Sequence, residues 1–193
     1  MTIRTALLSI DRARRLVKLR RFDIKLLVEG AVWRRIQVEV SFPEGRIAEV
    51  AEEVPAPSAG CFGIATPDHL AGIVMSYQVA QKSHACTDPD DPPGFVNDRV
   101  RDVVDLLLIK EHFYPDGPTP ELRAACVDVS AARGAEAEAL GIAARFWPPR
   151  VVANEEWIGA YPGLAGTVGI TLDLDEVLAV INGWITEINR ATR

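Results

Sequence analysis

A lysine and three aspartates are the most regularly arranged set of polar residues in this chain. Asp98, Asp102 and Asp105 follow one another at spacings that, at about 100° per residue, place them in one narrow band of a helix. Lys82 precedes them, on the other side of a proline-rich stretch. These residues gather lysine and carboxylate side chains on two predicted helices joined by a proline-rich loop. If the protein has an active site, part of it is expected here.

The same residues also fit an ordinary solvated helix face. Arg99 can pair with Asp102 at i+3 and Arg101 with Asp105 at i+4, but with arginine N-terminal to aspartate such pairs contribute only about 0.2–0.5 kcal/mol. Lys82 can lie along a helix surface with its ammonium group in water. From the residue pattern alone, the solvated face is the more frequent explanation.

Two predicted helices position this cluster. Thr66 as an N-cap, followed by a proline and an acid, predicts a helix from Thr66 to about Cys86. The proline-rich run at residues 88–94 must end it, because proline lacks the backbone donor. A second helix is predicted to begin near Asn97 or Asp98. Its apolar residues at helical spacing predict a stripe that faces a core: Val100, Val103, Val104, Leu107 and Leu108.

Upstream of these helices, two segments alternate apolar with polar residues, as half-buried strands do. They cover residues 22–28 and 36–42, with a turn at Glu29 and Gly30 between them, and predict a hairpin. Beyond Phe113 the chain is predicted to be mostly helical. The last helix has a long regular apolar stripe: Leu174, Val177, Leu178, Ile181, Trp184, Ile185 and Ile188.

The predicted fold class is therefore α+β. A small N-terminal antiparallel β-hairpin or sheet is expected in residues 1–66, and a mainly helical region in residues 67–193, together forming one compact unit. The length of 193 residues, with 48% hydrophobic and 25% charged residues, is enough for a sizeable core.

Two stretches around the cluster resemble the nucleotidyltransferase toxins of the AbiEii type, known from abortive-infection toxin–antitoxin systems. In that family a helix with a pattern like A-x-K-L-H-A is followed by a loop and then by R-x-K-D-L-x-D-L. This chain has AQKSHA at residues 80–85 and RVRDVVDL at residues 99–106. Both halves and their order agree, with departures at Ser83 and Arg101, where the family most often has leucine and lysine. The resemblance covers roughly residues 22–185.

The resemblance implies a role for each matching residue. Lys82 corresponds to the lysine that contacts nucleotide phosphate, and Asp102 corresponds to the essential downstream aspartate. Asp105 would shape the site beside Asp102. Arg99 and Arg101 correspond to the basic residues on either side, and would help to bind phosphate. The implied fold is that of a truncated nucleotidyltransferase.

The metal site is where this chain departs from the family. Nucleotidyltransferases of this superfamily hold metal with a Gly-Ser turn followed by Asp-x-Asp, and no Gly-Ser occurs here. We interpret Asp173 and Asp175 as helix-initiating acids, not as that pair. Glu39 matches the aspartate of a V-D-V triplet and is a candidate Mg²⁺ ligand, although a polar-face strand residue is the alternative. The chain is expected to look like the family with its N-terminal third removed.

The function that the resemblance implies is transfer of a nucleotide from a nucleoside triphosphate to an RNA acceptor, with tRNA as the candidate and Mg²⁺ as cofactor. This chain alone is expected to be inactive or nearly so, because it lacks the main metal-binding pair. The alternative is a non-catalytic remnant or regulatory protein that self-associates or binds an antitoxin-like partner. A sheet shortened by lost strands exposes an edge, which predicts a homodimer through that edge.

Composition adds limits on location and partners. No apolar run approaches the roughly 20 residues of a membrane span, and the three cysteines form no Cys-x-x-Cys pair, so a reducing cytoplasm without membrane association is predicted. A net charge of −6 argues against broad nonspecific nucleic-acid binding. A compact basic run near the start could hold an RNA backbone or an acidic partner: Arg12, Arg14, Arg15, Lys18, Arg20 and Arg21.

Overall fold

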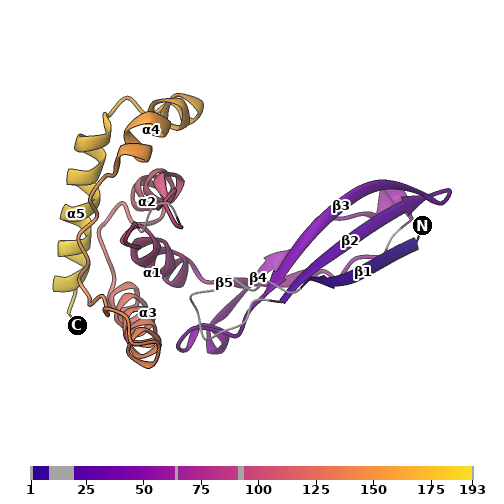
Figure 1. Ribbon diagram of the computed structural model, residues 1–193, viewed down its shortest axis with the longest axis horizontal. Helices are drawn as coiled ribbons and strands as arrows, with labels where there is room; N and C mark the ends of the chain where they lie inside the picture. Colours follow the sequence, from indigo (N-terminus) through magenta and orange to yellow (C-terminus); the bar gives the residue numbers. More distant parts are fainter. Residues whose placement is uncertain (1, 9–19, 64, 91–93, 193) are drawn as a thin grey trace.

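The computed structural model describes residues 2–8, 20–63, 65–90 and 94–192. These residues form two small antiparallel sheets near the N-terminus, followed in the sequence by five α-helices (Figure 1). The strands project as one β-arm, formed by residues 2–8 and 20–73, from a helical body formed by residues 75–192 (Figure 1). The predicted α+β class is confirmed, whereas most of the predicted basic run lies outside the described residues.

The larger sheet has three antiparallel strands in the order β1-β2-β3. Strand β1 spans Thr2–Leu8, β2 spans Arg20–Val28 and β3 spans Ala31–Val40. Glu29 and Gly30 connect β2 to β3 with positive φ angles of 51° and 84°, the conformation that two-residue hairpin turns require. The predicted hairpin is therefore confirmed, and β1 adds a third strand on the other side of β2.

The strand register gives this sheet one apolar face. Phe22 pairs with Val38, and Ile24 pairs with Ile36, so these four side chains lie on the same side. The other side is polar and charged: Arg21, Asp23, Lys25, Arg35, Gln37 and Glu39. The alternating pattern predicted half-buried strands, and β2 is half-buried. All ten residues of β3 are exposed, because nothing in the described part of the chain covers this strand.

The second sheet has two strands. Strand β4, Ala51–Pro55, pairs antiparallel with β5, His69–Ile73. Short 3₁₀ helices span Ile47–Glu49 and Gly60–Phe62. The predicted helix start at Thr66 is therefore wrong. Pairing with β4 holds the following residues in an extended conformation and overrides a capping signal that is worth only about 1 kcal/mol.

Five α-helices form the rest of the described chain. Helix α2 begins two to three residues after its predicted start. The bounds are α1 Met75–Ala85, α2 Val100–Phe113, α3 Pro120–Ala139, α4 Glu155–Val168 and α5 Leu174–Arg190. Asp173 caps α5 in a reciprocal capping box with Glu176, which confirms the interpretation of Asp173 as a helix-initiating acid.

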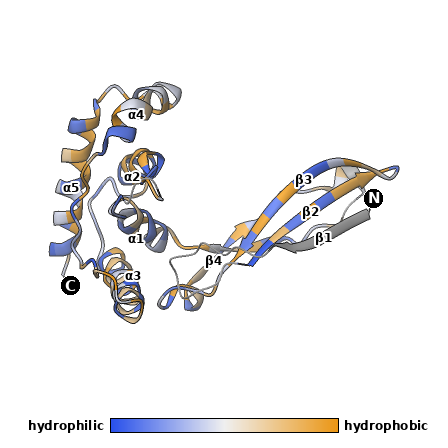
Figure 2. Ribbon diagram, viewed as in Figure 1, coloured by the Kyte–Doolittle hydropathy of each residue, from blue (hydrophilic) through white to orange (hydrophobic). Residues whose placement is uncertain are grey.

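The hydrophobic core lies between the helices. The predicted apolar stripes of α2 and α5 are buried apart from Leu108 and Leu174, which pack partly buried against the core. Among the described residues, Ile47 is the only buried apolar side chain that comes from before α1. Apolar residues are nevertheless frequent along the strands as well as the helices (Figure 2). None of the helices in the described ranges has the length and apolarity needed to cross a bilayer.

Residues 44–47 of the β-arm pack against the helical body. Ile47 is buried in the core, and the Glu44 carboxylate lies 2.9 Å from Nη2 of Arg133 on α3. Both side chains of this ion pair are mostly buried, so solvent screens it less than a surface pair. This segment joins the β-arm to α3.

Asp128 on α3 also binds this segment. Its Oδ2 accepts from the backbone N–H of Arg46 and from the Tyr77 hydroxyl, each at 2.8 Å. Gly45 has a φ of +53°, and a Cβ at that position would lie 2.2 Å from Asp128 Oδ2. Glycine is therefore required here both for the backbone conformation and for the approach of the carboxylate.

Candidate functional site

The predicted phosphate-binding lysine and two of the predicted acids meet between α1 and α2. Lys82 Nζ lies 2.7 Å from Asp102 Oδ1 and 2.6 Å from Asp105 Oδ2. Lys82 comes from the last turn of α1, and Asp102 comes from the first turn of α2. The fold thus brings together one cation and two carboxylates that are 20 and 23 positions apart in the sequence. We call these three residues the Lys82 cluster.

The Lys82 cluster is partly buried. The side chains of Lys82, Asp102 and Asp105 are 25%, 13% and 39% exposed, so a fully solvated face does not describe Asp102. Burial acts to lower the Lys82 pKa, but the hydrogen bonds and charges of the two carboxylates outweigh it and raise the pKa above its ordinary value. Lys82 is therefore an ammonium ion at neutral pH, fixed in place before any ligand arrives.

Arginine side chains extend the positive charge toward solvent. Arg99 Nη1 lies 3.7 Å from Asp102 Oδ2, which is the predicted i+3 pair. Arg101, in the first turn of α2, is exposed. Asp98, which precedes the helix, is also exposed. Both arginines line a pocket together with Asp102, whereas Lys82 and Asp105 are not among its lining residues.

A shallow pocket of about 600 Å³ opens beside these residues. Its wall comes from the start of α2 and from α4, and consists of Asp98, Arg99, Val100, Arg101, Asp102, Ala160, Gly163 and Leu164. The volume lies in the range of roughly 300–1,000 Å³ typical of small-molecule sites. Two guanidinium groups and two carboxylates at this wall make it a polar site of mixed charge.

Glu39, the candidate metal ligand, lies on β3 of the β-arm. Its Oε1 accepts from Arg21 Nε at 2.8 Å, across the β2–β3 ladder. The searched residues, which are those that the structure describes, contain no group of three or more His, Cys, Asp or Glu side chains that could hold a metal ion. No contact joins Glu39 to the Lys82 cluster among the interactions of these residues.

The carboxylates of the Lys82 cluster and of Glu39 are engaged in ion pairs. Mg²⁺ is usually bound by one or two carboxylates together with water and substrate phosphates, in strict octahedral geometry. Asp102 and Asp105 accept from the Lys82 ammonium, and Glu39 accepts from Arg21. These carboxylates are ion-pair partners here, so no chemical step is assigned to a metal.

Asn97 positions the loop between the two helices, a role that the sequence did not reveal. It is only 3% exposed, and its Nδ2 donates to the carbonyl groups of Ala85, Cys86 and Asp88 at 3.2, 3.4 and 2.8 Å. The backbone carbonyl of Asn97 accepts from the Trp157 indole N–H at 2.6 Å. In the sequence it is only a candidate N-cap, because the partners of a side-chain amide cannot be read from its neighbours.

Arg145 secures the same end of α1. Its Nη1 donates to the His84 carbonyl at 2.9 Å and to Thr87 Oγ1 at 3.0 Å, and its Nη2 pairs with the Asp88 carboxylate. The His84 carbonyl also accepts from the backbone N–H and the hydroxyl of Thr87, so Arg145 adds a further donor at the end of the helix. Together with Asn97, Arg145 fixes the turn of α1 that carries Lys82.

The chain matches no known protein family and no curated protein. Function is therefore inferred from the geometry of the Lys82 cluster together with the residues that carry the resemblance, 80–85 and 99–106.

Proposed function

We propose that this chain is a nucleotidyltransferase-like protein of the AbiEii toxin type that binds the phosphates of a nucleoside triphosphate beside α1 and α2. One observation supports this most: Lys82 Nζ contacts both Asp102 and Asp105, at 2.7 and 2.6 Å. These are the residues that match the family's lysine and aspartates. Two sequence motifs that act as one site must meet in space, and these two motifs do.

Lys82 can bind phosphate when it releases one of its two carboxylate partners. Lys82 provides a compact positive charge, and Asp102 holds that charge in one position. Arg99 and Arg101 provide guanidinium groups that can bind phosphate oxygens in pairs. Because the Asp105 side chain is 39% exposed and that of Asp102 is 13% exposed, an incoming phosphate would replace the contact of Asp105 with Lys82 more readily.

Nucleotide transfer to an RNA acceptor is proposed for a complete active site only. The sequence has no Gly-Ser turn with a following Asp-x-Asp pair, and the acids of the cluster are engaged by Lys82. For this chain alone we expect nucleotide binding without transfer. Mg²⁺, the RNA acceptor and an antitoxin-like partner belong to that complete system and remain part of the proposal.

Isothermal calorimetry tests the nucleotide site. Each nucleoside triphosphate is titrated, with and without Mg²⁺, into the wild-type chain, Lys82→Ala and the control Lys110→Ala at the other end of α2. Hydrogen bonds to charged groups contribute about 1.5–3 kcal/mol, so Lys82→Ala should weaken binding roughly tenfold or more. Lys110→Ala should bind as the wild type does. Absence of binding by a folded wild-type chain would rule out the proposed site.

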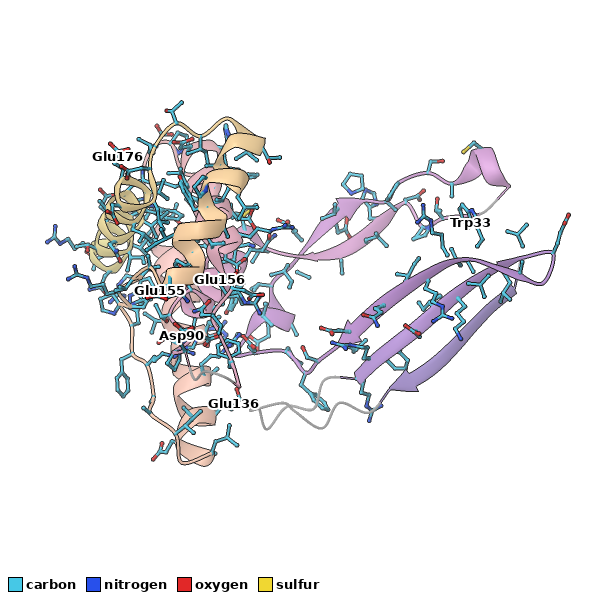
Figure 3. The ribbon with its side chains drawn as sticks, turned by 45° about the horizontal axis from the view of Figure 1, so that its top comes forward. Trp33, Asp90, Glu136, Glu155, Glu156 and Glu176 are labelled. Atoms are coloured by element: carbon cyan, nitrogen blue, oxygen red, sulfur yellow. The ribbon has the colours of Figure 1, made fainter. Side chains whose placement is uncertain are left out.

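A second role, as an interaction protein, is favoured by the β-arm. Trp33 of β3 is 65% exposed, other apolar side chains of β3 are also exposed, and Phe42, just beyond the strand, is 70% exposed. Figure 3 shows Trp33 on the part of the β-arm that is remote from the helices. Several large apolar side chains exposed along one strand are typical of a protein interaction site.

A further inference from the structure

The free edge of β3 is the surface that the functions above leave unexplained. Strand β3 pairs with β2 on one side only. Within the described residues, its backbone makes no hydrogen bond outside that ladder. An exposed edge is a template for another strand, and proteins usually protect such edges with lysine, proline, bulges or short length. The β2–β3 ladder has one irregularity, between Leu26 and Leu27, and residues 34–40 of β3 pair without interruption. Strand β3 contains neither lysine nor proline.

We infer that β3 pairs antiparallel with β3 of a second copy of this chain, around a two-fold axis at Gln37. In this register Arg35 lies opposite Glu39 of the second copy, and Ile36 lies opposite Val38 of the second copy. The two-fold axis makes each of these contacts twice. The inference deepens the interaction role proposed above, on which it rests, and is independent of nucleotide binding.

Only one register matches both faces and charges. Directly opposite residues in an antiparallel ladder lie on the same face, so Ile36 and Val38 must stay on the apolar side. An axis at Arg35 would place two arginines opposite each other. An axis at Ile36 would place Arg35 opposite Gln37, and an axis at Val38 would place Gln37 opposite Glu39. The axis at Gln37 is the one that pairs Arg35 with Glu39.

The charges within one copy support the same register. Arg35 lies directly opposite Lys25 of β2, and like charges at opposed positions destabilise a sheet. Glu39 lies opposite Arg21 and bonds to it from one side only. In the Gln37-centred register, Glu39 of the second copy would lie beside Arg35. The second copy would therefore supply the negative charge that the Lys25–Arg35 pair lacks.

Strand β4 shows what an edge protected against self-pairing looks like. It carries Glu52 and Glu53 side by side, and it ends at Pro55. Self-pairing of β4 would bring glutamates together, and Pro55 has no backbone N–H to donate. The contrast between β3 and β4 makes β4 a natural control position.

Sedimentation velocity at tens of micromolar, without nucleotide, tests the inference. The wild type should sediment as a dimer. Arg35→Glu places glutamates at both charge contacts, and Glu39→Arg places arginines at both, so each variant should weaken the dimer roughly tenfold or more. An equimolar mixture of the two variants should recover the dimer, because every charge contact between unlike copies is again a glutamate with an arginine. The control Glu52→Arg on β4 should remain dimeric.

Three results would overturn the inference: a monomeric wild type, a dimer that survives both charge reversals, or a mixture that stays monomeric. Circular dichroism melting establishes that each variant is folded, and the helical body buries its core without β3. Calorimetry with Arg35→Glu should show the nucleotide affinity of the wild type. Failure of the dimer and failure of the nucleotide site would thus appear in separate experiments.

Discussion

The helical body and the β-arm use apolar residues in opposite ways. Trp184 in the helical body is 1% exposed, whereas the tryptophan of β3 is largely in solvent. Both regions have apolar residues at regular spacing. The helices pack against one another, whereas no second layer covers the three-stranded sheet in the part of the chain that the structure describes. A single layer cannot bury its apolar face. The difference teaches that regular apolar spacing identifies a surface to be covered, and does not identify what covers it.

Alanine substitutions of two tryptophans, one in each region, should give the largest difference in the free energy of unfolding. Trp184→Ala should lower the free energy of unfolding by about 3–5 kcal/mol, because it removes a fully buried ring. Trp33→Ala should change it by less than about 0.5 kcal/mol in the monomeric state, as is usual at exposed positions. Urea denaturation followed by far-ultraviolet circular dichroism measures both. Similar losses for the two variants would mean that the β-arm has a core of its own.

Two side-chain amides extend the comparison to polar residues. Asn97→Ala should cost about 2–3 kcal/mol, because it removes the buried amide that donates to the carbonyl groups of Cys86 and Asp88. Gln37→Ala on the exposed β3 should cost less than about 0.5 kcal/mol. The same denaturation experiment compares them. If Asn97→Ala were neutral, the loop between α1 and α2 would not depend on this residue.

The connection between the two regions can be tested at two glycines that both have positive φ. Gly45→Ala forces a Cβ against the Asp128 carboxylate, whereas Gly30→Ala meets no atom within 4 Å. Each substitution costs about 1–2 kcal/mol for the left-handed backbone. Gly45→Ala should lose roughly 1 kcal/mol more, because it disturbs the hydrogen bond from the Arg46 backbone N–H to Asp128. Hydrogen exchange of residues 44–47 should rise only in Gly45→Ala. Equal exchange in both variants would argue against this anchor.

The smallest expected effect is the pH dependence of the Lys82 cluster. Because the folded pKa of Lys82 is raised, its contribution to stability is complete below the ordinary lysine pKa of about 10.4 and is lost as pH rises through the folded value. The stability difference between the wild type and Lys82→Met should therefore shrink by a few tenths of a kcal/mol in strongly alkaline solution. Thermal melts from neutral to alkaline pH measure it.

Tyr77 titrates in an overlapping range and sets the control for that experiment. Burial, together with its hydrogen bond to Asp128, raises the pKa of Tyr77 to about 12, so its contribution is also lost as pH rises. This loss is common to the wild type and Lys82→Met, and cancels in the difference between them. A difference that stays constant with pH would show that the charge of Lys82 adds no stability.

Local signals in the sequence predicted most of the helical body. The stripe on α5, its capping acid at Asp173 and the two-residue turn at Glu29 and Gly30 all follow from short-range geometry. Long-range pairing overrode the local helix-capping signal at Thr66, because residues 69–73 pair with β4 instead of forming a helix. The sequence also did not predict the exposure of β3. Alternation of apolar and polar residues specifies the two faces of a strand, but it does not specify whether another layer covers one of them.

For the candidate site, the sequence by itself determined the chemical groups and the helix face on which Asp102 and Asp105 lie together. Only the tertiary structure decided that Lys82 lies within hydrogen-bond distance of both carboxylates, and that Glu39 binds Arg21 on a separate part of the molecule. The physical reason is the sequence separation over which each kind of interaction acts. Helical periodicity fixes neighbours three and four residues apart, whereas the approach of α1 to α2 depends on core packing and on the buried amide of Asn97.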